Sequence, residues 1–79
     1  MKREEIFKLI NDIFIDVLEN EKIILKEEFD INDIDEWDSL TNILLIVEIE
    51  KKFNVNFTSS EITKWKDIGE MITAIESKV

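Results

Sequence analysis

Few side chains in this sequence are suited to covalent chemistry, and one serine stands out among them by its position. The 79 residues include no cysteine and no histidine, which excludes disulfides, thiolate nucleophiles, Ser-His catalysis and the usual zinc ligands. Ser39 lies in Asp38-Ser39-Leu40, between an acidic segment and an apolar one. Because the chain offers no evident general base for its hydroxyl, Ser39 is not a self-sufficient nucleophile. We therefore expect a protein that is not an enzyme.

Ser39 also has the position of a residue at the start of a helix. Aspartate and serine are common there, since their oxygens accept hydrogen bonds from backbone N–H groups that have no helical partner. Residues 39–53 are rich in apolar side chains and end in Lys51-Lys52-Phe53, which predicts a helix over this range. We expect Ser39 to lie at the mouth of that helix.

At about 100° per residue, the predicted helix has two apolar stripes on roughly opposite sides. The first stripe comprises Leu45, Ile46, Ile49 and Phe53. The second stripe comprises Leu40, Ile43, Leu44 and Val47. One apolar stripe is enough to pack a helix into a small bundle. The second stripe is therefore not needed for the core, and its role has to be explained.

Three further segments carry helix signals. Over residues 4–19, apolar side chains recur every three or four positions, which predicts one buried helix face. Thr58-Ser59-Ser60-Glu61 fits a capping box, so a short helix is expected around residues 61–65. Asp67 and Glu70 give a second start signal. The last helix then follows, with an apolar face of Ile68, Met71, Ile72, Ile75 and Val79.

Residues 20–38 show no sustained period and are expected to form a long connection across the bundle. Its expected apolar anchors are Ile23, Ile24, Leu25, Phe29, Ile31 and Ile34. Its second half is acidic and holds no base, with Glu27, Glu28, Asp30, Asp33, Asp35, Glu36 and Asp38. Carboxylates therefore cluster just ahead of Ser39.

Composition and charge narrow the class of protein. With no proline and a single glycine, the chain lacks the turn residues of an all-β fold, and its length predicts one domain over residues 1–79. The net charge of -9 argues against nucleic acid as a partner and favours basic proteins. The same charge favours a monomer. Neither a secretory leader nor a membrane span is evident, so a cytoplasmic protein is expected.

The triplet Asp38-Ser39-Leu40, the acidic connection before it and the apolar helix after it together resemble the acyl carrier protein family over nearly the whole chain. The resemblance implies an all-α, antiparallel four-helix bundle with three main helices and one short helix. It implies that Ser39 carries covalent 4'-phosphopantetheine, added by a separate phosphopantetheinyl transferase. Asp38 would help the transferase hold the site, and Leu40 would anchor the helix start. The N-terminal amides and helix dipole would favour the phosphodiester.

Members of this family hold acyl groups as thioesters and present them to partner enzymes, here in fatty-acid, other lipid or specialised acyl biosynthesis. The resemblance implies that Ile43, Val47 and Glu48 bind partners whose docking surfaces are basic. Trp37 stands where many carriers have glycine. Peptidyl carriers tend to have Gly-Gly before the serine, so Glu36-Trp37-Asp38 argues against a peptidyl carrier. The predicted helix over residues 39–53 is less acidic than the corresponding helix of housekeeping acyl carriers, which favours a carrier dedicated to one specialised pathway.

Two alternatives remain open at this stage. Within the same class, the chain could be a D-alanyl or other aminoacyl carrier. From another class, it could be an acidic helical interaction module that uses the second stripe without a prosthetic group. Asp30-Ile31-Asn32-Asp33 starts like a calcium loop, but Ile34 and Asp35 occupy positions that need a ligand and a glycine. No metal site is expected.

Overall fold

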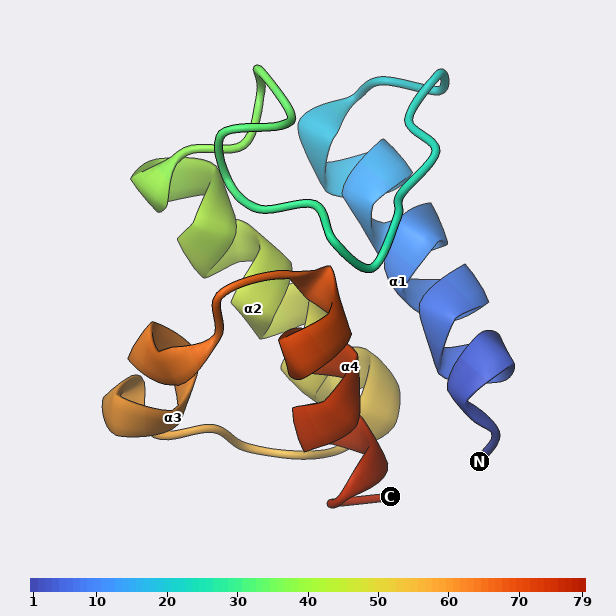
Figure 1. The fold of residues 1–79 in the computed structure, drawn as a ribbon, viewed down its shortest axis with the longest axis vertical. Coiled ribbons are helices and arrows are strands. Elements are labelled where there is room, and N and C mark those ends of the chain that lie inside the picture. Colours follow the sequence, from blue (N-terminus) through green and yellow to red (C-terminus); the bar gives the residue numbers. More distant parts are fainter.

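The computed structural model describes all of residues 1–79, which form four helices and no strand (Figure 1). These are α1 (Arg3–Leu18), α2 (Ser39–Phe53), α3 (Ser59–Lys64) and α4 (Ile68–Glu76). Both α2 and α4 run antiparallel to α1, while the short α3, which connects α2 to α4 along the chain, lies to one side (Figure 1). The predicted antiparallel bundle of three main helices and one short helix is confirmed.

The helix boundaries follow from their caps. The predicted capping box before α3 is present: Glu61 N–H donates to Thr58 Oγ1 at 3.1 Å, and Thr58 N–H donates to Glu61 Oε1 at 2.9 Å. Because Thr58 is the cap, α3 begins at Ser59 and ends at Lys64, two residues earlier at its start than expected. Glu70 N–H donates to Asp67 Oδ1 at 2.9 Å, which starts α4 as predicted.

The core lies where three helices meet, and α2 contributes the stripe expected of it. The buried positions of α1 are spaced by four residues, which fits one helix face. Fully or almost fully buried are Ile6, Ile10, Phe14 and Leu18 of α1, Leu45, Ile46, Ile49 and Phe53 of α2, and Ile68, Met71, Ile72 and Ile75 of α4. Val79, expected on the face of the last helix, lies beyond its end and is 46% exposed.

The connection between α1 and α2 is anchored at fewer points than expected. Ile23, Leu25 and Ile34 are buried, but Ile24 is 77% exposed and Ile31 is at the surface. Residues 23–25 lie outside any helix or turn, and burial alternates along them. With Ile23 and Leu25 turned into the core, Ile24 between them must face solvent.

Hydrogen bonds hold this connection against both neighbouring helices. Asn11 of α1 accepts from Leu25 N–H at 2.7 Å, while the amides of Ile68 and Gly69 donate to Phe29 O at 2.9 Å and to Glu27 O at 2.8 Å. Gly69 permits this close approach, because a Cβ there would lie 3.3 Å from the Glu27 carbonyl oxygen. The first turn of α4 is thereby joined to the connection.

Arg3, the first residue of α1, links three parts of the chain. Its guanidinium donates to Glu27 through Nη2 at 2.7 Å and through Nε at 3.1 Å. It also donates to Glu76 Oε1 at 2.9 Å, to Thr73 Oγ1 at 3.0 Å and to Gly69 O at 3.0 Å. The pKa of Glu27 is lowered chiefly by its hydrogen bond to Arg3. A single side chain therefore ties α1 to the connection and to α4.

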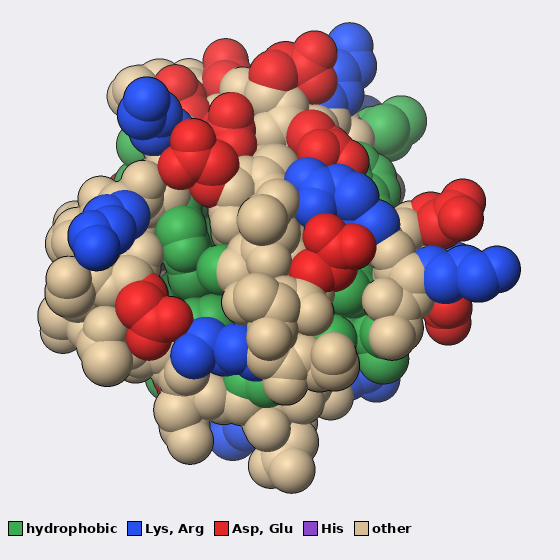
Figure 2. Space-filling view, turned by 60° about the horizontal axis from the view of Figure 1, so that its bottom comes forward, with side chains coloured by type: hydrophobic (Ala, Val, Ile, Leu, Met, Phe, Trp, Pro, Cys, Tyr) green, Lys and Arg blue, Asp and Glu red, His purple; other side chains and the backbone are tan.

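The surface carries charges of both signs, with acids in excess. Figure 2 shows carboxylates and basic side chains interspersed on one face, with small areas of hydrophobic side chains between them. Ion pairs join Glu27 and Glu76 to Arg3, Glu48 to Lys51, and Glu61 to Lys78. Most of the 19 acidic side chains therefore have no basic partner.

Candidate functional site

Ser39 is the first residue of α2, and its position is set by the cap before it. Asp38 is the N-cap, and its Oδ1 accepts from Leu40 N–H at 3.0 Å and from Thr41 N–H at 2.9 Å. The side chain of Ser39 is exposed, and its hydroxyl makes no hydrogen bond to another group of the protein. A reagent that approaches from solvent therefore meets an unengaged hydroxyl on a rigid backbone.

Thr41 completes the cap from the other direction. Asp38 N–H donates to Thr41 Oγ1 at 2.8 Å, and the same hydroxyl donates to Glu36 O at 3.0 Å. The chain on both sides of Ser39 is thus fixed by reciprocal bonds of the capping-box kind. Sequence reasoning missed Thr41, although its spacing from Asp38 is that of a capping box.

Fewer backbone N–H groups are free at the start of α2 than the sequence led us to expect. The carboxylate of Asp38 already satisfies two of them, so the Ser39 N–H is the amide left for another anion. Hydrogen bonds from the backbone of Thr41, and after it from the Thr41 side chain and Leu40 N–H, lower the pKa of Asp38. A charged carboxylate therefore stands next to the Ser39 hydroxyl at neutral pH. The helix dipole remains as the main attraction for a phosphodiester.

Trp37 ties the start of α2 to the core. Its indole is 7% exposed and packs edge-to-face on Phe14 of α1, with ring centroids 5.0 Å apart. Its Nε1–H donates to Asn42 Oδ1 at 3.0 Å. Leu40 was expected to anchor the helix start, but it is 70% exposed and lies outside the core. The contact that anchors α2 is therefore made by Trp37, because the indole and not Leu40 is turned toward α1.

The second stripe of α2 faces solvent. Ile43 is 61% exposed and Val47 is 40% exposed, and the remaining members, Leu40 and Leu44, are also at the surface. Glu48 is half-buried beside them and lies 3.8 Å from Lys51 Nζ. Several aliphatic side chains on one helical face form a patch of the kind that marks an interaction site.

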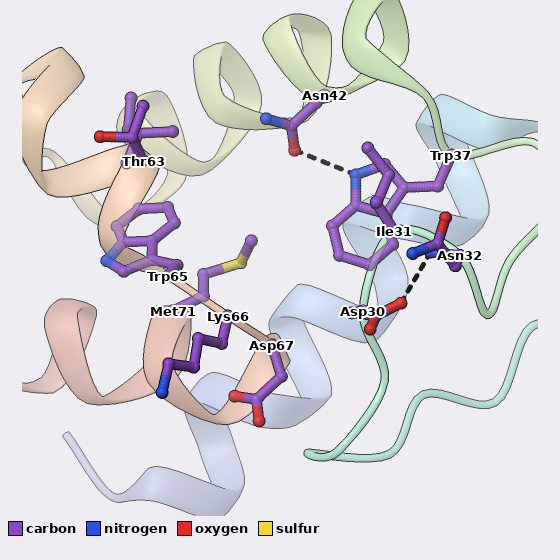
Figure 3. Close-up of a pocket in the computed structure, with 11 residues that line it drawn as sticks. Asp30, Ile31, Asn32, Trp37, Asn42, Thr63, Trp65, Lys66, Asp67 and Met71 are labelled. Atoms are coloured by element: carbon purple, nitrogen blue, oxygen red, sulfur yellow. Dashed lines mark hydrogen bonds between the residues drawn. The ribbon is translucent and has the colours of Figure 1, made fainter.

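A pocket of about 410 Å³ opens beside the helix start. Trp37 and Ile31 form one side, Trp65 and Met71 the other, and the Asn42 amide stands at one end (Figure 3). Asn42 lies three residues after Ser39, so the two side chains share a side of α2. The pocket combines residues from the connection, α2, α3 and α4. Because these residues are far apart in sequence, no local sequence pattern predicted the pocket.

The acidic segment before Ser39 uses some of its carboxylates to hold its own turn. Asp30 N–H donates to Asp33 Oδ2 at 2.8 Å, and Asn32 N–H donates to Asp30 Oδ1 at 2.8 Å. No three of the aspartate and glutamate side chains gather closely enough to hold a metal ion. None of the four helices has the length and apolar character needed to cross a membrane.

The fold and the site define a small helical protein that presents one capped, exposed serine hydroxyl beside a pocket. The family model for the phosphopantetheine attachment site matches residues 9–75. The acyl carrier protein of Lactobacillus acidophilus is 32% identical over 78 residues, which is 98% of this chain and 96% of that protein. The solution structure of a holo acyl carrier protein from Geobacter metallireducens matches with a TM-score of 0.86 at 33% identity, covering 91% of this chain and 83% of that one.

The chain belongs to the acyl carrier protein family. Covalently attached phosphopantetheine is its cofactor, and members of the family carry acyl groups without catalysing their reactions. The site accommodates such a group, since an accessible hydroxyl, a fixed backbone and an adjoining pocket occur together at the start of α2.

Proposed function

We propose that this chain is a single acyl carrier domain, residues 1–79, that holds acyl groups as thioesters on phosphopantetheine attached to Ser39. It presents them to enzymes of fatty-acid, other lipid or specialised acyl biosynthesis. One observation carries the assignment to Ser39: its hydroxyl is exposed and unengaged, directly after a carboxylate cap. By contrast, Ser77 Oγ donates to Ala74 O at 2.7 Å. Ser59 and Ser60 are also exposed and make no side-chain hydrogen bond, but the cap before them is the hydroxyl of Thr58 and not a carboxylate.

Two chemical groups that the proposed function needs, a thiol and a base, must come from outside this chain. With no cysteine, it has no thiol of its own, and the prosthetic arm supplies one when bound. With no histidine, it offers no evident base for Ser39, so a phosphopantetheinyl transferase must take the hydroxyl proton. The transfer forms the bond from Ser39 Oγ to phosphorus and breaks the pyrophosphate of coenzyme A, which releases adenosine bisphosphate.

The attachment residue is tested by mass spectrometry of the intact protein and its fragments. Incubation with coenzyme A and a broad-specificity transferase adds one phosphopantetheine to the wild type and none to Ser39→Ala. Ser77→Ala is the matched control and is modified at the wild-type rate. Addition to Ser59, Ser60 or Ser77 in the Ser39→Ala variant would refute the assignment.

The proposed partner surface lies on α2 and comprises the exposed Ile43 and Val47 together with the half-buried Glu48. Its aliphatic members supply contact area, and the surrounding carboxylates attract partners with basic docking surfaces. The partners are the transferase and the enzymes that load and process the acyl group. The protein is further proposed to be a cytoplasmic monomer that does not bind nucleic acid. The excess of negative charge supports the monomeric state and opposes binding to nucleic acid.

A further inference from the structure

The pocket beside Ser39 has an unusually polar lining for a site that would hold a hydrocarbon. Five of its eleven lining residues are hydrophobic. The remaining lining residues are Asp30, Asn32, Asn42, Thr63, Lys66 and Asp67. Because small-molecule sites are mostly apolar with few polar groups, this balance points to a ligand that carries polar groups of its own.

Asn42 supplies a hydrogen-bond donor that the protein does not use. The indole of Trp37 can only donate, so Asn42 must present its oxygen to Trp37 Nε1 and turn its amide nitrogen the other way. Figure 3 shows this nitrogen pointing away from Trp37, toward the side of the pocket that holds Thr63 and Trp65. No acceptor within the protein bonds to it.

The inner wall of the pocket is part of the core. It includes Trp37 and Met71, which are 7% and 3% exposed and belong to the buried hydrophobic cluster. At the end opposite Asn42 stand Lys66 and Asp67 (Figure 3). A long alkyl chain would therefore have to displace water from charged and amide groups without replacing their hydrogen bonds, which is unfavourable.

We propose, building on the attachment at Ser39, that this pocket receives a short acyl group bearing an oxygen acceptor near the thioester, and that Asn42 Nδ2 donates to that oxygen. A long saturated acyl group is not held there. Asn42 is thus a specificity-determining residue, which selects short oxo-acyl groups over alkyl groups by supplying, one helical turn from Ser39, a donor that no group of the protein uses.

The test compares arms of different chemistry on the wild-type protein. The transferase loads Ser39 from coenzyme A, butyryl-, 3-oxobutyryl- and octanoyl-coenzyme A, and intact mass verifies each product. The 3-oxobutyryl form melts roughly 4 °C above the butyryl form, the shift that one added hydrogen bond gives a domain of this size. The resonances of the Asn42 side-chain amide move with it. The octanoyl form melts no higher than the butyryl form.

Asn42→Asp is the matched variant, because it keeps an oxygen for Trp37 Nε1 and puts a charged acceptor oxygen in the place of the unused donor. In it, the advantage of 3-oxobutyryl over butyryl disappears. A higher melting temperature with octanoyl than with 3-oxobutyryl overturns the proposal, and so does an advantage that survives in the variant. If the variant does not fold, the melting temperatures of the three acylated forms of the wild type still test whether the pocket prefers an oxo-acyl group. Failure to load Ser39 refutes the proposed function instead.

Discussion

At the scale of single residues, Asp38 combines a structural task with an electrostatic one. Its carboxylate accepts two backbone hydrogen bonds and so fixes the first turn of α2, while its charge stands beside the Ser39 hydroxyl. The hydrogen bond from the Thr41 backbone is the largest cause of its lowered pKa. A carboxylate held in this way is bonded in its charged form, so protonation weakens the cap.

The lowered pKa predicts how the cap responds to acid. A carboxyl group whose pKa is lower in the folded state stabilises the fold above its unfolded value, and loses that contribution as the pH falls through the folded value. The difference in melting temperature between wild type and Asp38→Asn is therefore full at neutral pH and shrinks as the pH falls below the ordinary value of 3.8. Thermal melts of the two proteins across this range measure it. A difference that is the same at both ends would show that the charge of Asp38 contributes nothing.

At the scale of elements, α2 packs into the core with one side and exposes an apolar stripe to solvent on the other. Its core stripe could be distinguished from the exposed stripe by periodicity and family resemblance, and the structure confirms the division, with Ile49 fully buried and Ile43 exposed. An element with a spare apolar face on a small acidic domain is suited to transient docking, because the bundle is complete without it.

Charged substitutions on the two stripes have opposite expected outcomes. Val47→Glu and Ile43→Glu keep the helical circular-dichroism spectrum and melt within a few degrees of wild type, but they slow the transferase reaction by roughly tenfold or more, about 1.4 kcal/mol of lost binding. Ile49→Glu is the control and unfolds the domain, since it buries an unpaired charge. The assignment of the stripes would be reversed if Val47→Glu unfolded the protein and Ile49→Glu did not.

Arg3 predicts a second effect at this scale, because one guanidinium joins α1, the connection and α4. Arg3→Ala lowers the melting temperature by several degrees, and Arg3→Lys recovers only part of the loss, since an ammonium cannot reproduce the two-pronged contact with Glu27. Lys8→Ala is the control, because Lys8 is exposed and has no ion pair. Equal melting temperatures for Arg3→Ala and Lys8→Ala would show that the contacts of Arg3 are fully offset by solvation.

At the scale of the whole molecule, the net charge of -9 sets the conditions under which the bundle is most stable. Because few of its acids are paired, raising the ionic strength from low values screens their repulsion and raises the melting temperature. Calorimetry across a sodium chloride series measures this. Magnesium and calcium act in the same direction without saturating at one site. A melting temperature that does not change with salt would contradict the prediction.

Local signals account for what could be predicted from the sequence. Caps act over three residues and helix faces repeat every three or four, so the helix start at Ser39, the cap of α3 and the two stripes of α2 could be predicted, while the family resemblance indicated which stripe is buried. The anchoring by Trp37, the pocket and the Arg3 contacts were not, because they depend on which distant segments meet. Arg3 and Glu76, for example, are 73 positions apart in sequence. Leu40 was assigned an anchoring role by resemblance, and its exposure shows that a motif position does not specify a contact.

The hydrogen bonds between the connection and α4 have a consequence for amide hydrogen exchange. Amides in the first turn of a helix ordinarily exchange fast, because they lack helical acceptors. In α4, however, the Ile68 and Gly69 amides donate to carbonyls of the connection at 2.9 and 2.8 Å. We expect their exchange to be slow and to become fast only when the connection detaches from α4. These two amides therefore report on whether the segment that leads to Ser39 opens by itself or only with the whole bundle.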